Sequence, residues 1–203
     1  MDAVVFDIGG VLLDWSPEYL YADLIPDPAE RDHFLTNVTS PAWNLRQDEG
    51  RPWSEAVAEL SERFPEHTDL IAAYDTGWLQ MCRGIMADTA RLHDELIQDG
   101  VPTYALTNFS TEKWELATQT FAELRVFDGE VVSGTEQTTK PGEKIYRILL
   151  ERYDLDPART FYTDDVQRNV DAARTLGITA ELFTGADDLR ARLTEHGLLT
   201  QRP

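Results

Sequence analysis

Residues 3–12 read AVVFDIGGVL, a short apolar run that ends in an aspartate and two glycines. The run Ala3 to Phe6 is typical of a buried strand, and Asp7 follows it directly. Because glycines allow a tight turn, the Asp7 carboxylate is expected to be exposed at the end of this strand. An Asp-x-Gly-Gly turn is more often structural than catalytic, so this stretch indicates a site only together with others.

Further short apolar runs follow along the chain, with helical patterns between several of them. The runs are Val101 to Leu106, Val131 to Val132, Thr160 to Thr163 and Ala180 to Phe183, and the clearest helical patterns are Gly142 to Tyr153 and Val166 to Leu176. Alternating strands and helices predict an α/β fold with a Rossmann-like, mostly parallel sheet and helices on both faces. Such sheets bind ligands beyond the carboxyl ends of their strands.

One region breaks this alternation, because residues 16–81 have helical patterns and no convincing strand. Asp27 followed by Pro28 predicts a helix start, and Ser54 predicts another. We therefore expect two domains. Residues 1–15 and 82–203 form the core domain, and residues 16–81 form an all-helical cap domain inserted after the first strand.

Composition limits the partners of the protein. The 203 residues carry 18 Lys and Arg against 37 Asp and Glu, a formal net charge of -19. This charge argues against nucleic acid and anionic membranes as partners, since both attract basic surfaces. The single cysteine excludes an intramolecular disulfide, and no apolar stretch is long enough to span a membrane. A reducing cytoplasm is the expected location. Only three lysines are present, so a lysine in a motif stands out.

Three more polar segments lie where the predicted strands end or a helix begins. Thr107 and Asn108 follow one strand, and a hydroxyl and an amide there can bind phosphate oxygens or cap the next helix. Lys140 precedes Pro141 at the start of a helix. Asp164 and Asp165 follow another strand, and two adjacent carboxylates repel each other unless a cation or donors offset the repulsion. Oxygen ligands of this kind suit Mg²⁺.

Taken in order, these segments resemble the haloacid dehalogenase-like hydrolase superfamily over essentially the whole chain. TKPGEKIY at residues 139–146 and FYTDDVQRNVDAARTLGI at residues 161–178 look like its later motifs. The nearest variant is the small bacterial phosphatase branch typified by α-D-glucose-1-phosphate phosphatase and the phosphatase domain of soluble epoxide hydrolase. The stretches from Trp43 to Gly50 and from Trp53 to Ala56 look like the cap signature of that branch.

The resemblance implies a Mg²⁺-dependent phosphatase that acts on a small phosphorylated metabolite through an aspartyl-phosphate formed on Asp7. The implied metal ligands are Asp7, the Gly9 carbonyl and the Asp164–Asp165 pair, with Asp165 bound directly and Asp164 through water. The implied phosphate-binding residues are Thr107, Asn108 and Lys140, with Lys140 also catalytic. Asn169 is expected to orient the metal shell.

One position departs from the superfamily pattern. Most of its phosphatases carry a second aspartate two residues after the nucleophile, which protonates the leaving alcohol, and Gly9 stands there instead. The glucose-1-phosphatase branch also lacks this acid. Asp14, His33 and Asp48 are the candidate substitutes.

Two further functions stay open at this point. A 2-haloacid dehalogenase has the same fold and nucleophile, but it needs no metal, and the paired acids count against it. A non-catalytic metabolite-binding protein is the other alternative. Arg46 and Trp43 are weak candidates for substrate contacts from the cap, where packing is the commoner role of a tryptophan. The substrate and the oligomeric state, monomer or homodimer, are not predicted.

Overall fold

The computed structural model of the chain describes residues 1–200 and has a five-stranded sheet at its centre. The strand order is β5-β4-β1-β6-β7, and each neighbouring pair is parallel. The bounds are β1 Ala3–Phe6, β4 Thr103–Thr107, β5 Gly129–Val132, β6 Thr160–Asp164 and β7 Thr179–Leu182. The predicted α/β fold is confirmed, with β1 in the middle of the sheet.

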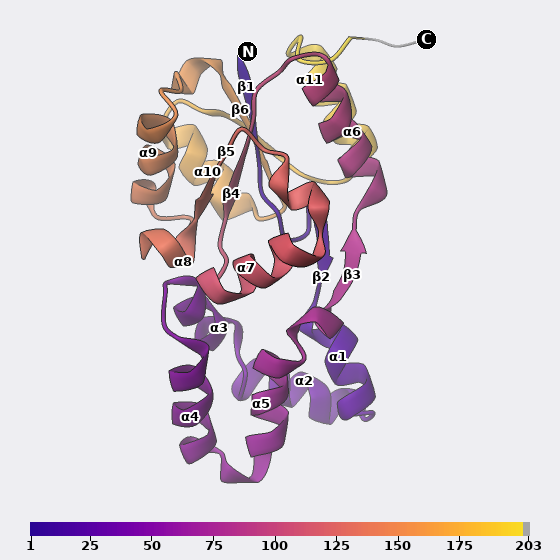
Figure 1. Cartoon of the computed structure of the whole chain (residues 1–203), viewed down its shortest axis with the longest axis vertical. Coiled ribbons are helices and arrows are strands. Elements are labelled where there is room, and N and C mark those ends of the chain that lie inside the picture. Colours follow the sequence, from indigo (N-terminus) through magenta and orange to yellow (C-terminus); the bar gives the residue numbers. More distant parts are fainter. Residues whose placement is uncertain (201–203) are drawn as a thin grey trace.

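Helices cover both faces of this sheet (Figure 1). Helices α6 and α11 lie on one face, where Val4 and Phe6 of β1 pack into their cluster. Helices α9 and α10 lie on the other face, where Val5 packs. Apolar side chains on both faces are typical of strands in a parallel sheet. The helices of this part are α6 Ala87–Gln98, α7 Thr111–Thr120, α8 Ser133–Glu136, α9 Glu143–Arg152, α10 Gln167–Thr175 and α11 Ala186–Glu195, with 3-10 helices at Ala122–Arg125 and Pro157–Arg159.

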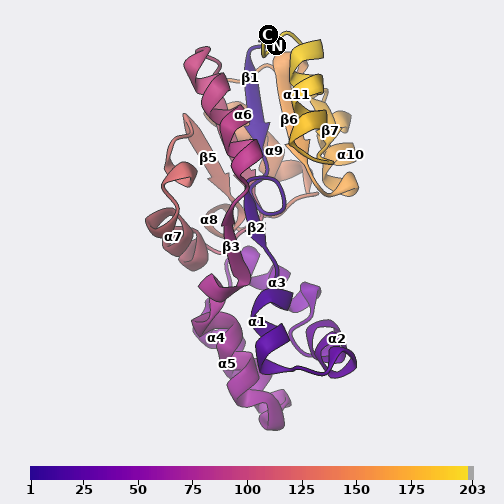
Figure 2. The same cartoon turned by 90° about the vertical axis from the view of Figure 1, so that its right-hand side faces the viewer.

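A block of helices lies between two short antiparallel strands, β2 Leu13–Trp15 and β3 Cys82–Ile85. Its members are α1 Pro17–Leu24, α2 Pro28–Asn37, α3 Pro41–Asp48, α4 Trp53–Arg63 and α5 Thr68–Thr76, with 3-10 helices at Pro65–His67 and Trp78–Met81. We call residues 17–81 the helical insertion. It lies beyond the end of β1 that leads into Asp7 (Figure 2). The sequence patterns missed β2 and β3, because most of their residues are only partly buried and form no continuous apolar run.

Helix starts in the insertion follow local capping chemistry in three of five cases. Asp27 caps α2 by accepting hydrogen bonds from the backbone N–H groups of Ala29 and Glu30, both at 2.9 Å, so the predicted start is confirmed. Ser16 and Ser40 cap α1 and α3 in the same way. The predicted start at Ser54 is wrong, since α4 begins at Trp53.

Helix α4 is capped instead by a residue from the core part of the chain. The backbone N–H of Trp53 donates to Oε1 of Glu112 on α7 at 3.0 Å, and the Trp53 indole donates to Oγ of Ser110 at 2.8 Å. A carboxylate at a helix N-terminus also meets the positive end of the helix dipole. The insertion and the α7 region are therefore joined by polar contacts as well as by a shared apolar cluster that includes Leu12, Trp53 and Phe109.

None of the helices within residues 1–200 is long and apolar enough to cross a membrane. The division into a core domain and a cap domain at residues 16 and 81 stays a prediction, as does the cytoplasmic location.

Replacing Glu112 by alanine tests the contact that caps α4. We expect Glu112→Ala to lower the free energy of unfolding by about 1 kcal/mol, because the Trp53 N–H loses a charged acceptor. Urea denaturation followed by circular dichroism measures this loss. Glu115→Ala on the exposed side of the same helix is the matched control and should change stability by less than about 0.5 kcal/mol. Equal losses in the two variants would contradict the capping role.

Candidate active site

Asp7 follows the central strand and is almost completely buried, with 7% of its surface exposed. Its Oδ1 atom accepts a hydrogen bond from the backbone N–H of Ile8 at 2.6 Å and lies 2.8 Å from Nζ of Lys140. The carboxylate is therefore fixed through Oδ1. Within residues 1–200 no group donates a hydrogen bond to Oδ2, so that oxygen is not engaged by the protein.

Lys140 connects Asp7 to the end of β6. Its buried ammonium donates to Oδ2 of Asp164 at 2.7 Å and to the carbonyl of Leu106 at 2.9 Å, in addition to its pairing with Asp7. An ammonium has three N–H donors, so all three are directed at protein acceptors. In this arrangement Lys140 holds two carboxylates side by side. Its contact with phosphoryl oxygens stays a prediction.

Asn108 holds Lys140 in place. Its Oδ1 accepts from the backbone N–H of Lys140 at 2.8 Å, and its Nδ2 donates to the Lys140 carbonyl at 3.0 Å. Thr107, at the end of β4, is 1% exposed, and within residues 1–200 its hydroxyl has no hydrogen-bond partner. Thr107 therefore keeps its hydroxyl unpaired, whereas the Asn108 amide is paired with the Lys140 backbone. Phosphate binding by both residues stays a prediction.

Asp164 is completely buried and surrounded by donors. Its Oδ2 accepts from Lys140 and from the Tyr162 hydroxyl, and its Oδ1 accepts from the backbone N–H of Val166 at 2.8 Å. Nδ2 of Asn169 lies 3.0 and 3.1 Å from the two oxygens. Burial raises the pKa of Asp164, but the Lys140 charge and these donors outweigh burial and hold the pKa below its usual value.

Asp165 completes a cluster of three carboxylates. One oxygen each from Asp7, Asp164 and Asp165 lie within 4.8 Å of one another, and Asp165 is the exposed member. Burial and the negative charge of Asp164 raise the pKa of Asp165 against the opposing charge of Lys140. Burial raises the pKa of Asp7 to about 8. The negative charges of Asp164 and Asp165 also raise this pKa, and the positive charge of Lys140 lowers it. Three acids facing one ammonium leave an excess of negative charge, and an all-oxygen donor set of this kind fits a hard divalent cation.

The two glycines after Asp7 have different surroundings. Gly10 has a φ of +73°, and a Cβ atom there would lie 2.3 Å from Oδ2 of Asp165. Glycine at this position therefore lets the Asp165 carboxylate approach the loop. A Cβ atom at Gly9 would meet nothing within 4 Å. The missing acid at Gly9 thus leaves open space beside Asp7.

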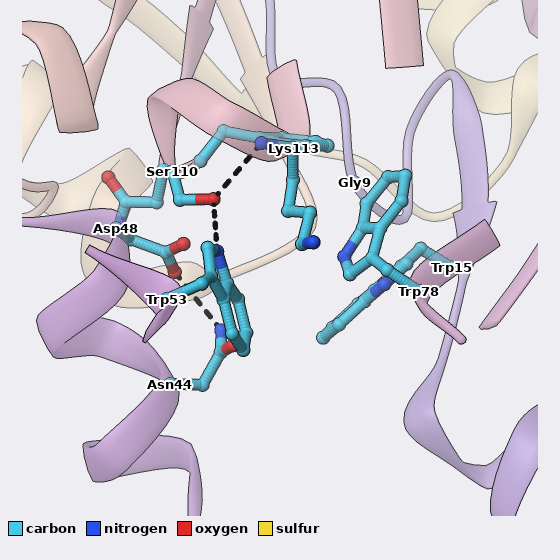
Figure 3. Close-up of a pocket in the computed structure, with 10 residues that line it drawn as sticks. Gly9, Trp15, Asn44, Asp48, Trp53, Trp78, Ser110 and Lys113 are labelled. Atoms are coloured by element: carbon cyan, nitrogen blue, oxygen red, sulfur yellow. Dashed lines mark hydrogen bonds between the residues drawn. The ribbon is translucent and has the colours of Figure 1, made fainter. Parts of the chain in front are cut away.

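A pocket of about 80 Å³ begins at this open space and lies between the core and the insertion (Figure 3). Its lining consists of Gly9, Trp15, Asn44, Asp48, Trp53, Trp78, Asn108, Phe109, Ser110 and Lys113. The Lys113 side chain extends between Trp53 on one side and Trp15 and Trp78 on the other (Figure 3). Trp15, Ser110 and Lys113 were not predicted as site residues. The scarcity of lysine was the one signal in the sequence that could have pointed to Lys113.

The structure does not bring the two predicted substrate-contact residues to this pocket. Trp43 is buried and makes an edge contact with Trp53, with ring centroids 5.7 Å apart. The Arg46 side chain is half-exposed, and its Nη1 atom lies 3.5 Å from Oε1 of Glu59 on α4. Neither lines the pocket.

Of the three candidate substitutes for the acid missing at Gly9, one lines the pocket. This residue is Asp48. Burial raises the pKa of Asp48 to about 7, although a hydrogen bond from the backbone N–H of Ser110 lowers it. His33 lines a separate cavity between α2 and Leu70, and Asp14 accepts a hydrogen bond from the Tyr19 hydroxyl at 2.7 Å.

Comparison with known proteins agrees with this arrangement. The family model of the haloacid dehalogenase-like hydrolases matches residues 1–177. The chain belongs to this family. It is thus a hydrolase of the haloacid dehalogenase-like type.

Two curated relatives and one solved structure are similar over most of the chain. The sesquiterpene phosphatase astK of Aspergillus oryzae is 26% identical, with 87% of this chain and 86% of that protein covered. The phosphorylated carbohydrates phosphatase of Thermotoga maritima is 22% identical, with 88% and 82% covered. A family enzyme from Bacteroides thetaiotaomicron, solved with magnesium and inorganic phosphate, is 22% identical, with 90% and 93% covered and a TM-score of 0.69.

The glycine pair of this haloacid dehalogenase-like hydrolase allows a matched test of the loop. Gly10→Ala forces a Cβ atom against Asp165 at a positive φ, so we expect it to lower the free energy of unfolding by about 1 to 3 kcal/mol. Gly9→Ala meets open space and should lower it by less than about 0.5 kcal/mol. Urea denaturation of both variants measures the difference. A loss at Gly9 as large as that at Gly10 would contradict the description of the loop.

The raised pKa of Asp7 predicts how the metal-free protein responds to pH. Below pH 8 the folded state keeps a proton on Asp7 that the unfolded state releases above about pH 4, so stability falls as the pH rises between these values. Titration of Asp7 alone lowers the free energy of unfolding by at most about 1.4 kcal/mol per pH unit in this range. We expect Asp7→Asn to remove this contribution.

Urea denaturation in EDTA at pH 6.5, 7.25 and 8 measures the effect as the difference between the wild type and Asp7→Asn. The exposed acid Asp171, replaced by asparagine, is the control and should leave the slope unchanged. A difference between wild type and Asp7→Asn that does not change with pH would show that the Asp7 pKa is not raised.

Proposed function

We propose that this hydrolase is a Mg²⁺-dependent phosphomonoesterase that acts on a small phosphorylated metabolite, with Asp7 as the nucleophile. The observation that carries the proposal is the cluster of Asp7, Asp164 and Asp165 around the buried Lys140 ammonium. Two relatives named as phosphatases and a similar structure solved with magnesium and phosphate support it.

In this proposal, Asp7, the Gly9 carbonyl and Asp165 hold the Mg²⁺ ion directly. Both oxygens of Asp164 already accept hydrogen bonds from the protein, which favours an indirect role for Asp164 through water. Asn169 orients Asp164 through its amide. When bound, the ion offsets the repulsion between the anionic site and a phosphate group.

Asp7 attacks the phosphorus atom through Oδ2, since Oδ1 is engaged by Ile8 and Lys140. A bond forms between this oxygen and phosphorus while the bond from phosphorus to the ester oxygen breaks, and the alcohol leaves with a proton. Water then attacks phosphorus, which releases inorganic phosphate and restores the carboxylate. The unpaired Thr107 hydroxyl is suited to donate to a phosphoryl oxygen, and the Lys140 charge balances the negative charge that develops there.

Gly9 offers no acid for the leaving alcohol, and Asp48 is our candidate for the proton donor. It lines the pocket that begins at Gly9, and with a pKa raised to about 7 it is present in both protonation states near neutral pH. The names of the two phosphatase relatives refer to a terpene and to carbohydrates, so they leave the chemical class of the alcohol open.

Release of inorganic phosphate from a panel of phosphate monoesters tests this function. We expect hydrolysis with Mg²⁺, loss of activity in EDTA, and a decrease of at least about 10³-fold in kcat for Asp7→Asn. Asp171→Asn should keep wild-type rates. Undiminished hydrolysis by Asp7→Asn would contradict the assigned nucleophile, and chelator-resistant release of halide from 2-haloacids would support a dehalogenase instead.

A further inference from the structure

The walls of the pocket at Gly9 are mainly aromatic. Trp15 on β2, Trp53 on α4 and Trp78 after α5 contribute three indole rings (Figure 3). Phe109 after β4 adds a fourth aromatic ring. Trp53, Trp78 and Phe109 are each less than 10% exposed. Rings of this size favour contact with apolar surface.

The polar side chains between these rings are largely paired with one another. Nδ2 of Asn44 donates to Asp48 at 3.2 Å. Oγ of Ser110 accepts from the Trp53 indole at 2.8 Å and from the backbone N–H of Lys113 at 3.3 Å. Asn108 uses both ends of its amide on the Lys140 backbone. Few donors and acceptors are therefore left to bind the hydroxyl groups of a ligand.

The single ammonium in the pocket wall is also neutralised within the protein. Nζ of Lys113 pairs with the Asp75 carboxylate and donates to the Asp75 carbonyl at 3.0 Å. It lies 5.1 Å from the centre of the Trp53 ring. Lys113 is 8% exposed, and its partner Asp75 is partly buried. The pocket has no uncompensated positive charge to attract a second anionic group.

One buried donor in the wall has no partner within residues 1–200, and it is Nε1 of Trp15. A single N–H suits one oxygen of a ligand, whereas a sugar carries several hydroxyl groups. Hydroxyl groups that leave water for an aromatic wall without new hydrogen bonds destabilise the complex.

We propose that the alcohol released by this enzyme is apolar, so that its substrates are monophosphate esters of aliphatic or isoprenoid alcohols and not sugar phosphates. The inference rests on the proposed phosphatase function and names its substrate class. The phosphate lies at Asp7, and the hydrocarbon part extends past Gly9 between Trp15, Trp53 and Trp78. The cavity volume of about 80 Å³ accommodates the part of the hydrocarbon nearest the phosphate.

The test compares geranyl monophosphate with glucose 6-phosphate and glycerol 3-phosphate as substrates of the full chain with Mg²⁺. We expect kcat/KM to be at least about 10²-fold higher for the geranyl ester. Equal or higher kcat/KM for either polar ester would overturn the inference and leave the phosphatase function in place.

A binding measurement separates this inference from the proposed function. If no ester is hydrolysed, the proposed phosphatase function is wrong. Isothermal titration of the same esters into the protein then still shows whether the pocket prefers an apolar or a polar alcohol group. Binding of geranyl monophosphate at least about 10-fold tighter than glucose 6-phosphate supports the apolar pocket, and equal or weaker binding overturns it.

A wall variant locates the effect in the pocket. Trp15→Leu should lower kcat/KM for the geranyl ester about 10-fold and change it less than about twofold for glycerol 3-phosphate. The matched control is Tyr104→Leu, which should not change kcat/KM for either ester. Tyr104 is a partly buried aromatic residue in the cluster with α9 and α10, and it does not line the pocket. Phe109→Leu is a second wall variant if Trp15→Leu does not fold. Equal effects of a wall variant on both esters would contradict contact with the alcohol.

Discussion

The buried Lys140 ammonium between Asp7 and Asp164 is the interaction on which the site depends. A lysine and two aspartates cannot be buried without one another, since each unpaired charge would cost several kcal/mol in a dry interior. Their pairing brings together chain segments that are more than 130 residues apart. The Asn108 amide and the Leu106 carbonyl then fix the lysine from the end of β4, which lies next to β1 on the side away from β6.

The net charge of the chain does not decide the charge of the ligand that suits the site. The net charge of -19 is distributed over many exposed carboxylates, whereas the site is set by a few buried groups. Exposed charges are screened by salt over about 10 Å, and buried ones much less. The outer surface therefore says little about which ligands can bind at Asp7.

Much of this site could be predicted from the sequence because its residues follow strands directly. Asp7, Thr107 and Asp164 each lie at a strand end, where a parallel sheet gathers its functional groups. The pocket wall could not be predicted in this way, since Trp15 and Lys113 reach it only through packing between the core and the insertion. Trp43 and Trp53 have similar local sequence signals and are both buried, and only the fold shows that Trp53 lines the pocket and Trp43 does not.

The distribution of lysines has a practical consequence. Lys113 and Lys140 are buried in ion pairs, while Lys144 at the start of α9 is exposed. Amine-directed coupling would therefore attach the folded protein to a support or a dye mainly through one side chain on α9 and through the amino terminus. The molecules coupled through a lysine would therefore share one attachment point, Lys144.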